Sequence, residues 1–101
     1  MPKQNRYTVP AVDPTMPDPT FISAVWDKAD NEFGFYFFKR DRFGTIIAKH
    51  HFAEQSEYGW VIEYITPTAE GGTADLDNLR PTHWRNAGGE IMTMPRQARE
   101  A

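Results

Sequence analysis

Proline and glycine divide this sequence into short segments, and no other feature limits its fold as strongly. The chain has 101 residues, with eight prolines and seven glycines. Proline lacks a backbone N–H and fixes φ, so a proline-rich segment propagates neither a helix nor a strand. We therefore expect residues 1–19 to form an extended arm, residues 20–94 one folded domain and residues 95–101 a flexible tail. The arm holds five prolines: Pro2, Pro10, Pro14, Pro17 and Pro19.

Short apolar stretches separated by turn residues predict the elements of the domain. Thr20 is expected to cap a short helix over residues 21–29, whose apolar residues share one face. Residues 35–38, 45–52 and 60–65 are β-prone, and a short strand should follow Leu79. A short helix near His83 should end at Gly88-Gly89. The predicted fold class is α+β: a small single domain with antiparallel β-hairpins and one short N-terminal helix.

The larger apolar residues are the candidates for the core. The hairpin and the second helix are expected to bury Trp60, Ile62, Ile65, Leu76, Leu79 and Trp84. A wider aromatic set is most simply assigned to the core as well, with a stacking platform for nucleic-acid bases as the alternative. Its members are Phe35, Phe37, Phe38, Phe43, Phe52, Trp60 and Trp84.

Charge and composition exclude some classes of function. The net charge is −3, whereas a protein that binds nucleic acid mainly through phosphates usually carries a basic excess. Without cysteines there is no disulfide framework and no cysteine zinc site. We find no secretory signal and no membrane span, so a cytoplasmic protein is expected. The basic residues are interpreted as a solvated face: Lys39, Arg40, Arg42, Lys49, Arg80 and Arg85.

The segment from Ser56 to Asn86 carries the most specific pattern. It is SEYGWVIEYITPTAEGGTADLDNLRPTHWRN. An aromatic-led strand ends in an acidic residue, and proline, Gly-Gly, Asn-Leu and His-Trp follow in that order. In this pattern the chain resembles the small phage-type members of the HNH (ββα-metal) endonuclease family, over roughly residues 38–90. The resemblance implies a ββα-metal core and metal-assisted phosphodiester hydrolysis.

Two of the family's functional positions are altered here. The resemblance places Glu63 at the metal-binding acid, Asn78 at the asparagine that orients the catalytic histidine, and His83 at a position that is a metal ligand in some members. Tyr64 stands where the general-base histidine belongs, and Ala87 where a helix ligand belongs. Tyrosine titrates near ~10 and histidine near ~6.5, so a phenol is a poor base at neutral pH. Loss of a general base commonly costs about 10²–10⁴-fold in rate.

Each of these residues also has a structural interpretation. Glu63 could be a solvent-facing strand carboxylate, Asn78 a turn residue that holds the Gly-Gly loop, and His83 a structural hydrogen-bonding group. Tyr64 is better explained as a strand aromatic than as a nucleophile. His50-His51 lies in a predicted strand, where adjacent side chains point to opposite faces and do not act as a pair.

The leading hypothesis is a catalytically inactive HNH-like domain that serves as a binding module of a phage or mobile element. A protein partner or self-association is favoured, with weak DNA binding left open and no cofactor expected. The alternative is a divergent but active nuclease that uses Mg²⁺ or Mn²⁺ at Glu63 and His83, with His50 or Glu70 as further candidates. On the leading hypothesis, Tyr64→His combined with Ala87→Asn could restore cutting.

Overall fold

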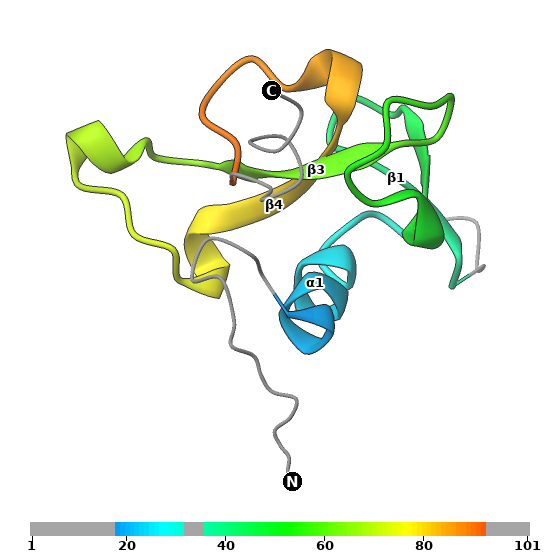
Figure 1. Cartoon of the computed structure of the whole chain (residues 1–101), viewed down its shortest axis with the longest axis horizontal. Coiled ribbons are helices and arrows are strands. Elements are labelled where there is room, and N and C mark those ends of the chain that lie inside the picture. Colours follow the sequence, from blue (N-terminus) through cyan, green and yellow to red (C-terminus); the bar gives the residue numbers. More distant parts are fainter. Residues whose placement is uncertain (1–17, 32–35, 93–101) are drawn as a thin grey trace, which may run out of the picture.

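A computed structural model describes residues 18–31 and 36–92, and it has one α-helix and two antiparallel β-hairpins. Helix α1 spans Pro19–Trp26. The first hairpin pairs β1 (Phe38–Arg40) with β2 (Ile46–Ala48), and the second pairs β3 (Trp60–Tyr64) with β4 (Leu79–His83). Figure 1 shows α1 lying against the second hairpin, with β1 on one side. The α+β class expected from the sequence is therefore confirmed.

Helix α1 begins at Pro19, two residues before the predicted start, and has a different N-cap. Asp18, rather than Thr20, is the N-cap, and its side chain accepts a hydrogen bond of 2.8 Å from the backbone N–H of Phe21. Pro19 takes the first helical position, where a missing N–H costs nothing. The helix also ends earlier than predicted, at Trp26 instead of residue 29. The folded domain thus includes the last two residues assigned to the arm, while residues 1–17 and 93–101 lie outside the described ranges.

The first hairpin and the ends of the second are also shifted from the prediction. β1 begins at Phe38 and continues through Lys39 and Arg40, so most of the predicted strand at 35–38 precedes it. The strand predicted at 45–52 is reduced to β2, followed by a 3-10 turn at Lys49–His51. After β4 the chain makes only a 3-10 turn, Trp84–Asn86, before Gly88-Gly89. A single turn therefore stands where a short helix was expected.

The core lies between α1 and the inner faces of the two hairpins. Six side chains have no exposed surface and form one cluster: Val25, Trp26, Ile47, Trp60, Ile62 and Leu79. The rings of Trp26 and Trp60 lie 5.2 Å apart and tilted by 45°, a favourable arrangement for two aromatic groups. These contacts bury the apolar face of α1 against β3 and β4, as the helical pattern required.

Several predicted core residues are instead exposed. Ile65 is 46% and Leu76 39% exposed, since they lie at and beyond the end of the hairpin. Trp84 is half-buried and donates its indole N–H to the carbonyl of Ser56 at 2.7 Å. Among the wider aromatic set, Phe37, Phe38 and Phe43 are exposed and Phe52 packs at the edge of the core, while Phe35 lies outside the described residues.

The free edge of β3 is paired with the chain that follows the second hairpin. The N–H of Tyr64 donates to the carbonyl of Glu90 at 2.9 Å, and the N–H of Met92 to that of Ile62 at 2.9 Å. A bridge pairs Glu63 with Ile91. This added segment satisfies the free edge of β3 and leaves Glu63 inside the molecule.

Candidate functional site

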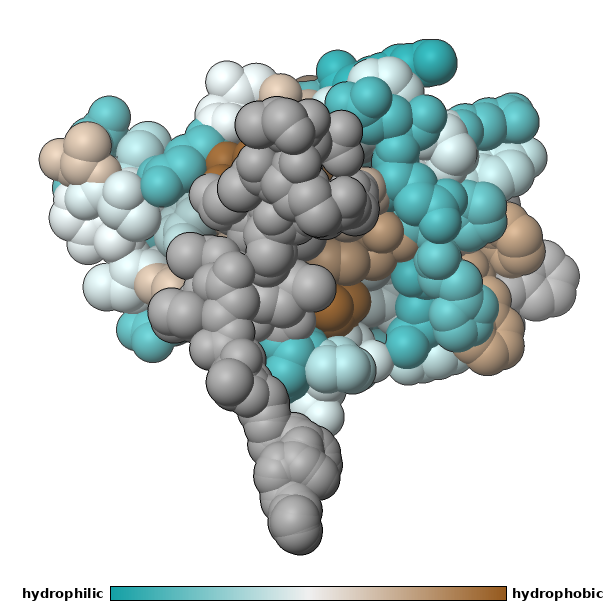
Figure 2. Space-filling view, in the orientation of Figure 1, coloured by the Kyte–Doolittle hydropathy of each residue, from teal (hydrophilic) through white to brown (hydrophobic). Residues whose placement is uncertain are grey.

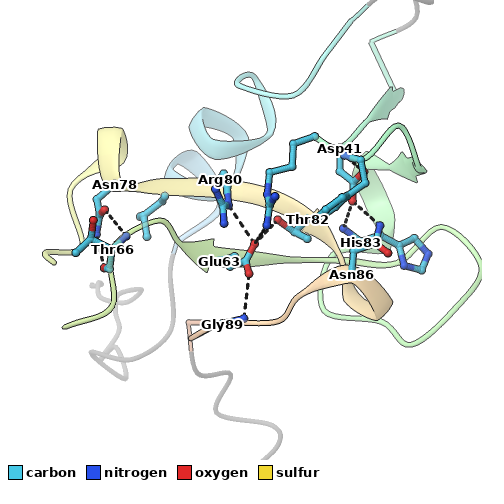
Figure 3. Close-up of polar contacts among 12 residues, drawn as sticks. Asp41, Glu63, Thr66, Asn78, Arg80, Thr82, His83, Asn86 and Gly89 are labelled. Atoms are coloured by element: carbon cyan, nitrogen blue, oxygen red, sulfur yellow. Dashed lines mark hydrogen bonds and ion pairs between the residues drawn. The ribbon is translucent and has the colours of Figure 1, made fainter. Parts of the chain in front are cut away.

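Glu63, the predicted metal-binding acid, is a buried carboxylate with internal partners on both oxygens. Its exposed fraction is 2%, so its interpretation as a solvent-facing residue is wrong. One oxygen, Oε1, accepts hydrogen bonds from Arg80 Nε at 3.1 Å and Thr82 Oγ1 at 2.9 Å. The other, Oε2, accepts from the backbone N–H of Gly89 at 3.1 Å. The guanidinium of Arg42 lies 3.7 Å from Oε1. Figure 3 shows Arg80, Thr82 and Gly89 converging on the carboxylate.

The electrostatics of Glu63 follow from this arrangement. Burial raises the pKa of its carboxyl group, because desolvation disfavours the charged form. Hydrogen bonds from Thr82, Arg80 and Gly89, together with the positive charge of Arg80, act in the opposite direction and hold the pKa below its ordinary value. Glu63 is therefore an ionised, ion-paired group within the fold, and both of its oxygens already accept hydrogen bonds from the protein.

A second buried carboxylate, Asp41, lies at the turn between β1 and β2 and was not identified as a site residue from the sequence. Its Oδ1 accepts the backbone N–H groups of Phe43 and Thr45, both at 3.0 Å. Its Oδ2 accepts from the N–H of His83 at 3.0 Å and from Asn86 Nδ2 at 2.9 Å. Asp41 thus joins the first hairpin to the end of β4. The local signal was the turn sequence that starts at Asp41 and ends in Gly44, which has a positive φ of 86°.

The pKa of Asp41 is also lowered. Burial raises it, but the hydrogen bonds from Asn86 and from the backbone N–H groups of His83, Thr45 and Phe43 outweigh that effect. All four donors are uncharged groups fixed by the fold. Asp41 is therefore stabilised as a carboxylate without a direct cationic partner among these donors.

His83 uses both of its ring nitrogens inside the protein. Nε2 lies 2.7 Å from the carbonyl oxygen of Glu57, which only accepts, and Nδ1 lies 3.1 Å from the backbone N–H of Arg85, which only donates. These partners assign the proton to Nε2. The lone pair on Nδ1 then already accepts a hydrogen bond. His83 is 3% exposed, and its geometry is that of a structural hydrogen-bonding group.

Asn78 fastens the loop that contains Gly71-Gly72. Its Oδ1 accepts the N–H of Thr66 at 2.9 Å, and its Nδ2 donates to the carbonyls of Thr66 at 3.0 Å and Thr73 at 2.8 Å. Gly72 sits directly beneath, where a Cβ atom would lie 1.8 Å from the carbonyl oxygen of Thr66. This is the loop-holding role considered for Asn78 in the sequence (Figure 3).

The predicted site residues are not brought to one place. Glu63 and Tyr64 are adjacent in β3 and therefore point to opposite faces of the sheet. Glu63 faces Arg80 and Thr82, whereas Tyr64 packs against the core. His83 pairs with Trp60 at the far end of the hairpin. Ala87 ends the 3-10 turn after β4. Within residues 18–31 and 36–92, no group of three or more His, Asp or Glu side chains is placed to hold a metal ion.

The two adjacent histidines lie in the 3-10 turn after β2 and not in a strand, which corrects the sequence prediction. The ring of His50 stacks on Phe37 at 5.1 Å. His51 Nδ1 lies 3.2 Å from Ser56 Oγ and 3.1 Å from a carboxylate oxygen of Glu54. Among residues 18–31 and 36–92, neither histidine shares a ring contact or hydrogen bond with Tyr64, so no replacement base is assembled there.

An exposed aromatic surface is formed by the start of the first hairpin and the turn after β2. Tyr36, Phe37 and Phe38 are 46%, 50% and 42% exposed. The rings of Tyr36 and Phe37 meet edge to face at 5.1 Å, and Phe38 meets Tyr58 in the same way at 5.8 Å. These rings form two groups, Tyr36 with Phe37 and His50, and Phe38 with Tyr58, which we together call the aromatic face. Figure 2 shows apolar surface at the edge where this hairpin lies in Figure 1.

Comparisons with known proteins give no relative for this chain: no family model, no curated protein and no solved structure matches it. None of the helices in the described ranges is long and apolar enough to cross a membrane.

Proposed function

We propose that the chain is a non-catalytic binding module, built on an HNH-like scaffold of a phage or mobile element, that recognises a protein partner. The observation that carries the proposal is the internal ion pairing and hydrogen bonding of Glu63, the residue on which a metal-dependent reaction would depend. Both carboxylate oxygens accept hydrogen bonds from the protein, and Arg80 forms an ion pair with Oε1 at 3.1 Å.

The chemistry of divalent cations supports this interpretation of Glu63. Mg²⁺ and Mn²⁺ bind through oxygen lone pairs in a nearly regular shell. At Glu63 the guanidinium of Arg80, with Arg42 3.7 Å away, already supplies the positive charge that a metal ion would bring. An incoming cation would have to displace Arg80 and meet its repulsion. The candidate ligand His83 adds no free lone pair, because Nδ1 accepts from Arg85.

The aromatic face supports a protein partner over a nucleic acid. Exposed apolar patches on soluble domains mark interaction sites, and the cores of protein interfaces are enriched in aromatic residues. Three adjacent residues of this face, Tyr36, Phe37 and Phe38, each leave more than two fifths of their surface exposed. The molecule as a whole has a net charge of −3, which disfavours the long polyanion of a nucleic-acid backbone.

A nicking assay on supercoiled plasmid with Mg²⁺ or Mn²⁺ tests the absence of catalysis. We expect no metal-dependent nicking from the purified wild-type chain. Tyr64→His with Ala87→Asn is also expected to remain inactive, because position 64 faces the core, away from Glu63. This revises the expectation from the sequence. Nicking by the wild type that disappears in a folded Glu63→Gln variant would establish the nuclease alternative instead.

Light scattering and partner capture test the binding surface. We expect Phe37→Ser with Phe38→Ser to abolish self-association or capture of a protein partner, since both aromatic side chains are exposed on this face. Leu76→Ser is the matched control: it removes an apolar residue that is 39% exposed on the other hairpin and should leave binding unchanged. A salt-sensitive electrophoretic shift with DNA that survives the double substitution would contradict a protein-binding function.

A further inference from the structure

A cavity of about 540 Å³ opens beside the β1–β2 turn, where α1 ends near β4. Four cationic side chains line it: Lys28, Arg40, Arg42 and Arg80. They come from the turn after α1, the β1–β2 hairpin and β4, so the fold gathers them from three separate parts of the chain. The aromatic face does not line this cavity, which shares only Arg42 and Arg80 with the Glu63 ion pairs described above.

Two of these cations are held in place by a buried group behind them. Arg80 donates from Nε to Glu63 Oε1, and Arg42 Nη2 lies 3.7 Å from the same oxygen. The Arg42 guanidinium also lies 4.0 Å from the ring centroid of Phe43, which is 54% exposed. Within the described residues, Arg80 makes no hydrogen bond from its terminal nitrogens and Arg42 makes none at all. The guanidinium groups of Arg42 and Arg80 therefore keep N–H donors for another acceptor.

The remaining groups fix the shape of the cavity. Lys28 Nζ donates to the main-chain carbonyls of Leu76, at 2.6 Å, and Leu79. Arg40 Nη1 donates to the carbonyl of Gly44 at 2.9 Å. Hydrogen bonds thus position Lys28, Arg40 and Arg80 before any ligand arrives, which reduces the entropy that binding would cost.

The local charge differs in sign from that of the whole molecule. Around the cavity, these four cations face three carboxylates, namely Asp30 and Asp41 in the lining and Glu63 behind it. Among the lining residues that the structure describes, cationic side chains therefore outnumber carboxylates, in a chain whose net charge is −3. A small anion responds mainly to these nearby groups, whereas a long polyanion also meets the rest of the acidic surface.

We propose that this cavity is an oxyanion-binding site for a small, multiply charged ligand that carries a phosphate or carboxylate group. The two guanidinium forks of Arg42 and Arg80 present their remaining N–H donors to the ligand oxygens, the geometry that arginine uses to bind both groups. The ring of Phe43 offers an apolar contact beside them. The proposal goes beyond the protein-binding function and does not depend on it.

Nuclear magnetic resonance of the ¹⁵N-labelled full chain tests this site with two probes, inorganic pyrophosphate and glutarate, each titrated at constant ionic strength with sodium chloride. We expect saturable shifts of the Nε–H signals of Arg42 and Arg80 and of the amide of Gly44. Binding of pyrophosphate alone assigns a phosphate site, binding of glutarate alone a carboxylate site, and binding of both a general oxyanion site. No saturable shift with either probe overturns the proposal.

Arg42 is the residue to change, because its side chain is 42% exposed and the fold does not depend on a hydrogen bond from it. Arg42→Gln should weaken probe binding about tenfold, the effect of losing a charged hydrogen-bonding group. Arg42→Lys keeps the charge but loses the planar N–H donors of the guanidinium group, and should also weaken binding. Arg85→Gln is the control of equal charge change, since Arg85 lies over Trp84 and outside this cavity. An equal loss in Arg85→Gln would show a long-range charge effect and refute the site.

Discussion

Replacing Glu63 by glutamine separates a structural carboxylate from a catalytic one. The amide keeps one oxygen for Arg80 and Thr82 but places an NH₂ group against the N–H of Gly89, donor against donor. It also removes the charge that Arg80 neutralises. Breaking a buried ion pair costs about 3–5 kcal/mol. Because the Arg80 side chain is 27% exposed and so partly hydrated, we expect a loss at the lower end, about 3 kcal/mol.

Urea unfolding at neutral pH, followed by tryptophan fluorescence, measures this loss. Thr82→Val is the graded control: it removes one hydroxyl donor, 2.9 Å from Glu63 Oε1 and fully buried, and should cost about 1.5 kcal/mol. In thermal unfolding the Glu63 variant should melt roughly 12 °C below the wild type.

A catalytic role for Glu63 would give the opposite sign. Residues kept for function are commonly held at a cost in stability, and their replacement leaves stability equal or higher. A Glu63→Gln variant as stable as the wild type would therefore refute the structural argument. So would a wild-type chain whose melting temperature rises with Mg²⁺ while that of the variant does not.

The two buried carboxylates and the Gly71-Gly72 loop can be tested by their effects on stability. Folding lowers the pKa values of Glu63 and Asp41. Their contribution to stability is therefore complete above their ordinary values of 4.5 and 3.8, and is lost as the pH falls through the folded-state values. Urea midpoints measured from about pH 6 down to about pH 3 should show the decline only on the acid side. Gly72→Ala should lower the free energy of unfolding by more than about 2 kcal/mol, because the new Cβ would lie 1.8 Å from a carbonyl oxygen. In the control Gly88→Ala the new Cβ meets nothing within 4 Å, and the free energy of unfolding should change by less than about 0.5 kcal/mol. Equal effects of the two substitutions would contradict this packing. Asn78→Ala should cost about 2 kcal/mol and accelerate hydrogen exchange mainly in the loop that it fastens, and uniform acceleration across the second hairpin would argue against a local role.

Local sequence signals predicted the elements that depend on near neighbours. The strand expected at 60–65 is found at Trp60–Tyr64, and the strand expected after Leu79 is found at Leu79–His83. Trp60, Ile62 and Leu79 are fully buried, as expected. Here β-prone residues, a following proline and a Gly-Gly loop all favour a hairpin, and tertiary packing favours the same strands.

The first hairpin was predicted less well, because its aromatic residues do not show which side of a sheet they occupy. Phe37 and Phe38 have the composition of a core strand, yet Lys39 is the buried residue of β1, 4% exposed. Its Nζ lies 5.6 Å from the ring centroid of Trp26 and 3.4 Å from the carbonyl of that residue. A buried lysine is accepted only where such partners exist, and these partners belong to another element.

The sequence by itself determined the short antiparallel elements, the loop positions and the residue types available for chemistry, because these follow from backbone preferences over a few neighbouring residues. Only the tertiary structure decided what the charged residues do. Glu63 meets Arg80 across 17 positions and Gly89 across 26, while Asp41 meets Asn86 across 45. Whether a carboxylate is free to bind a metal ion or is already ion-paired and hydrogen-bonded within the protein depends on donors from distant segments, and packing decides which donors reach it.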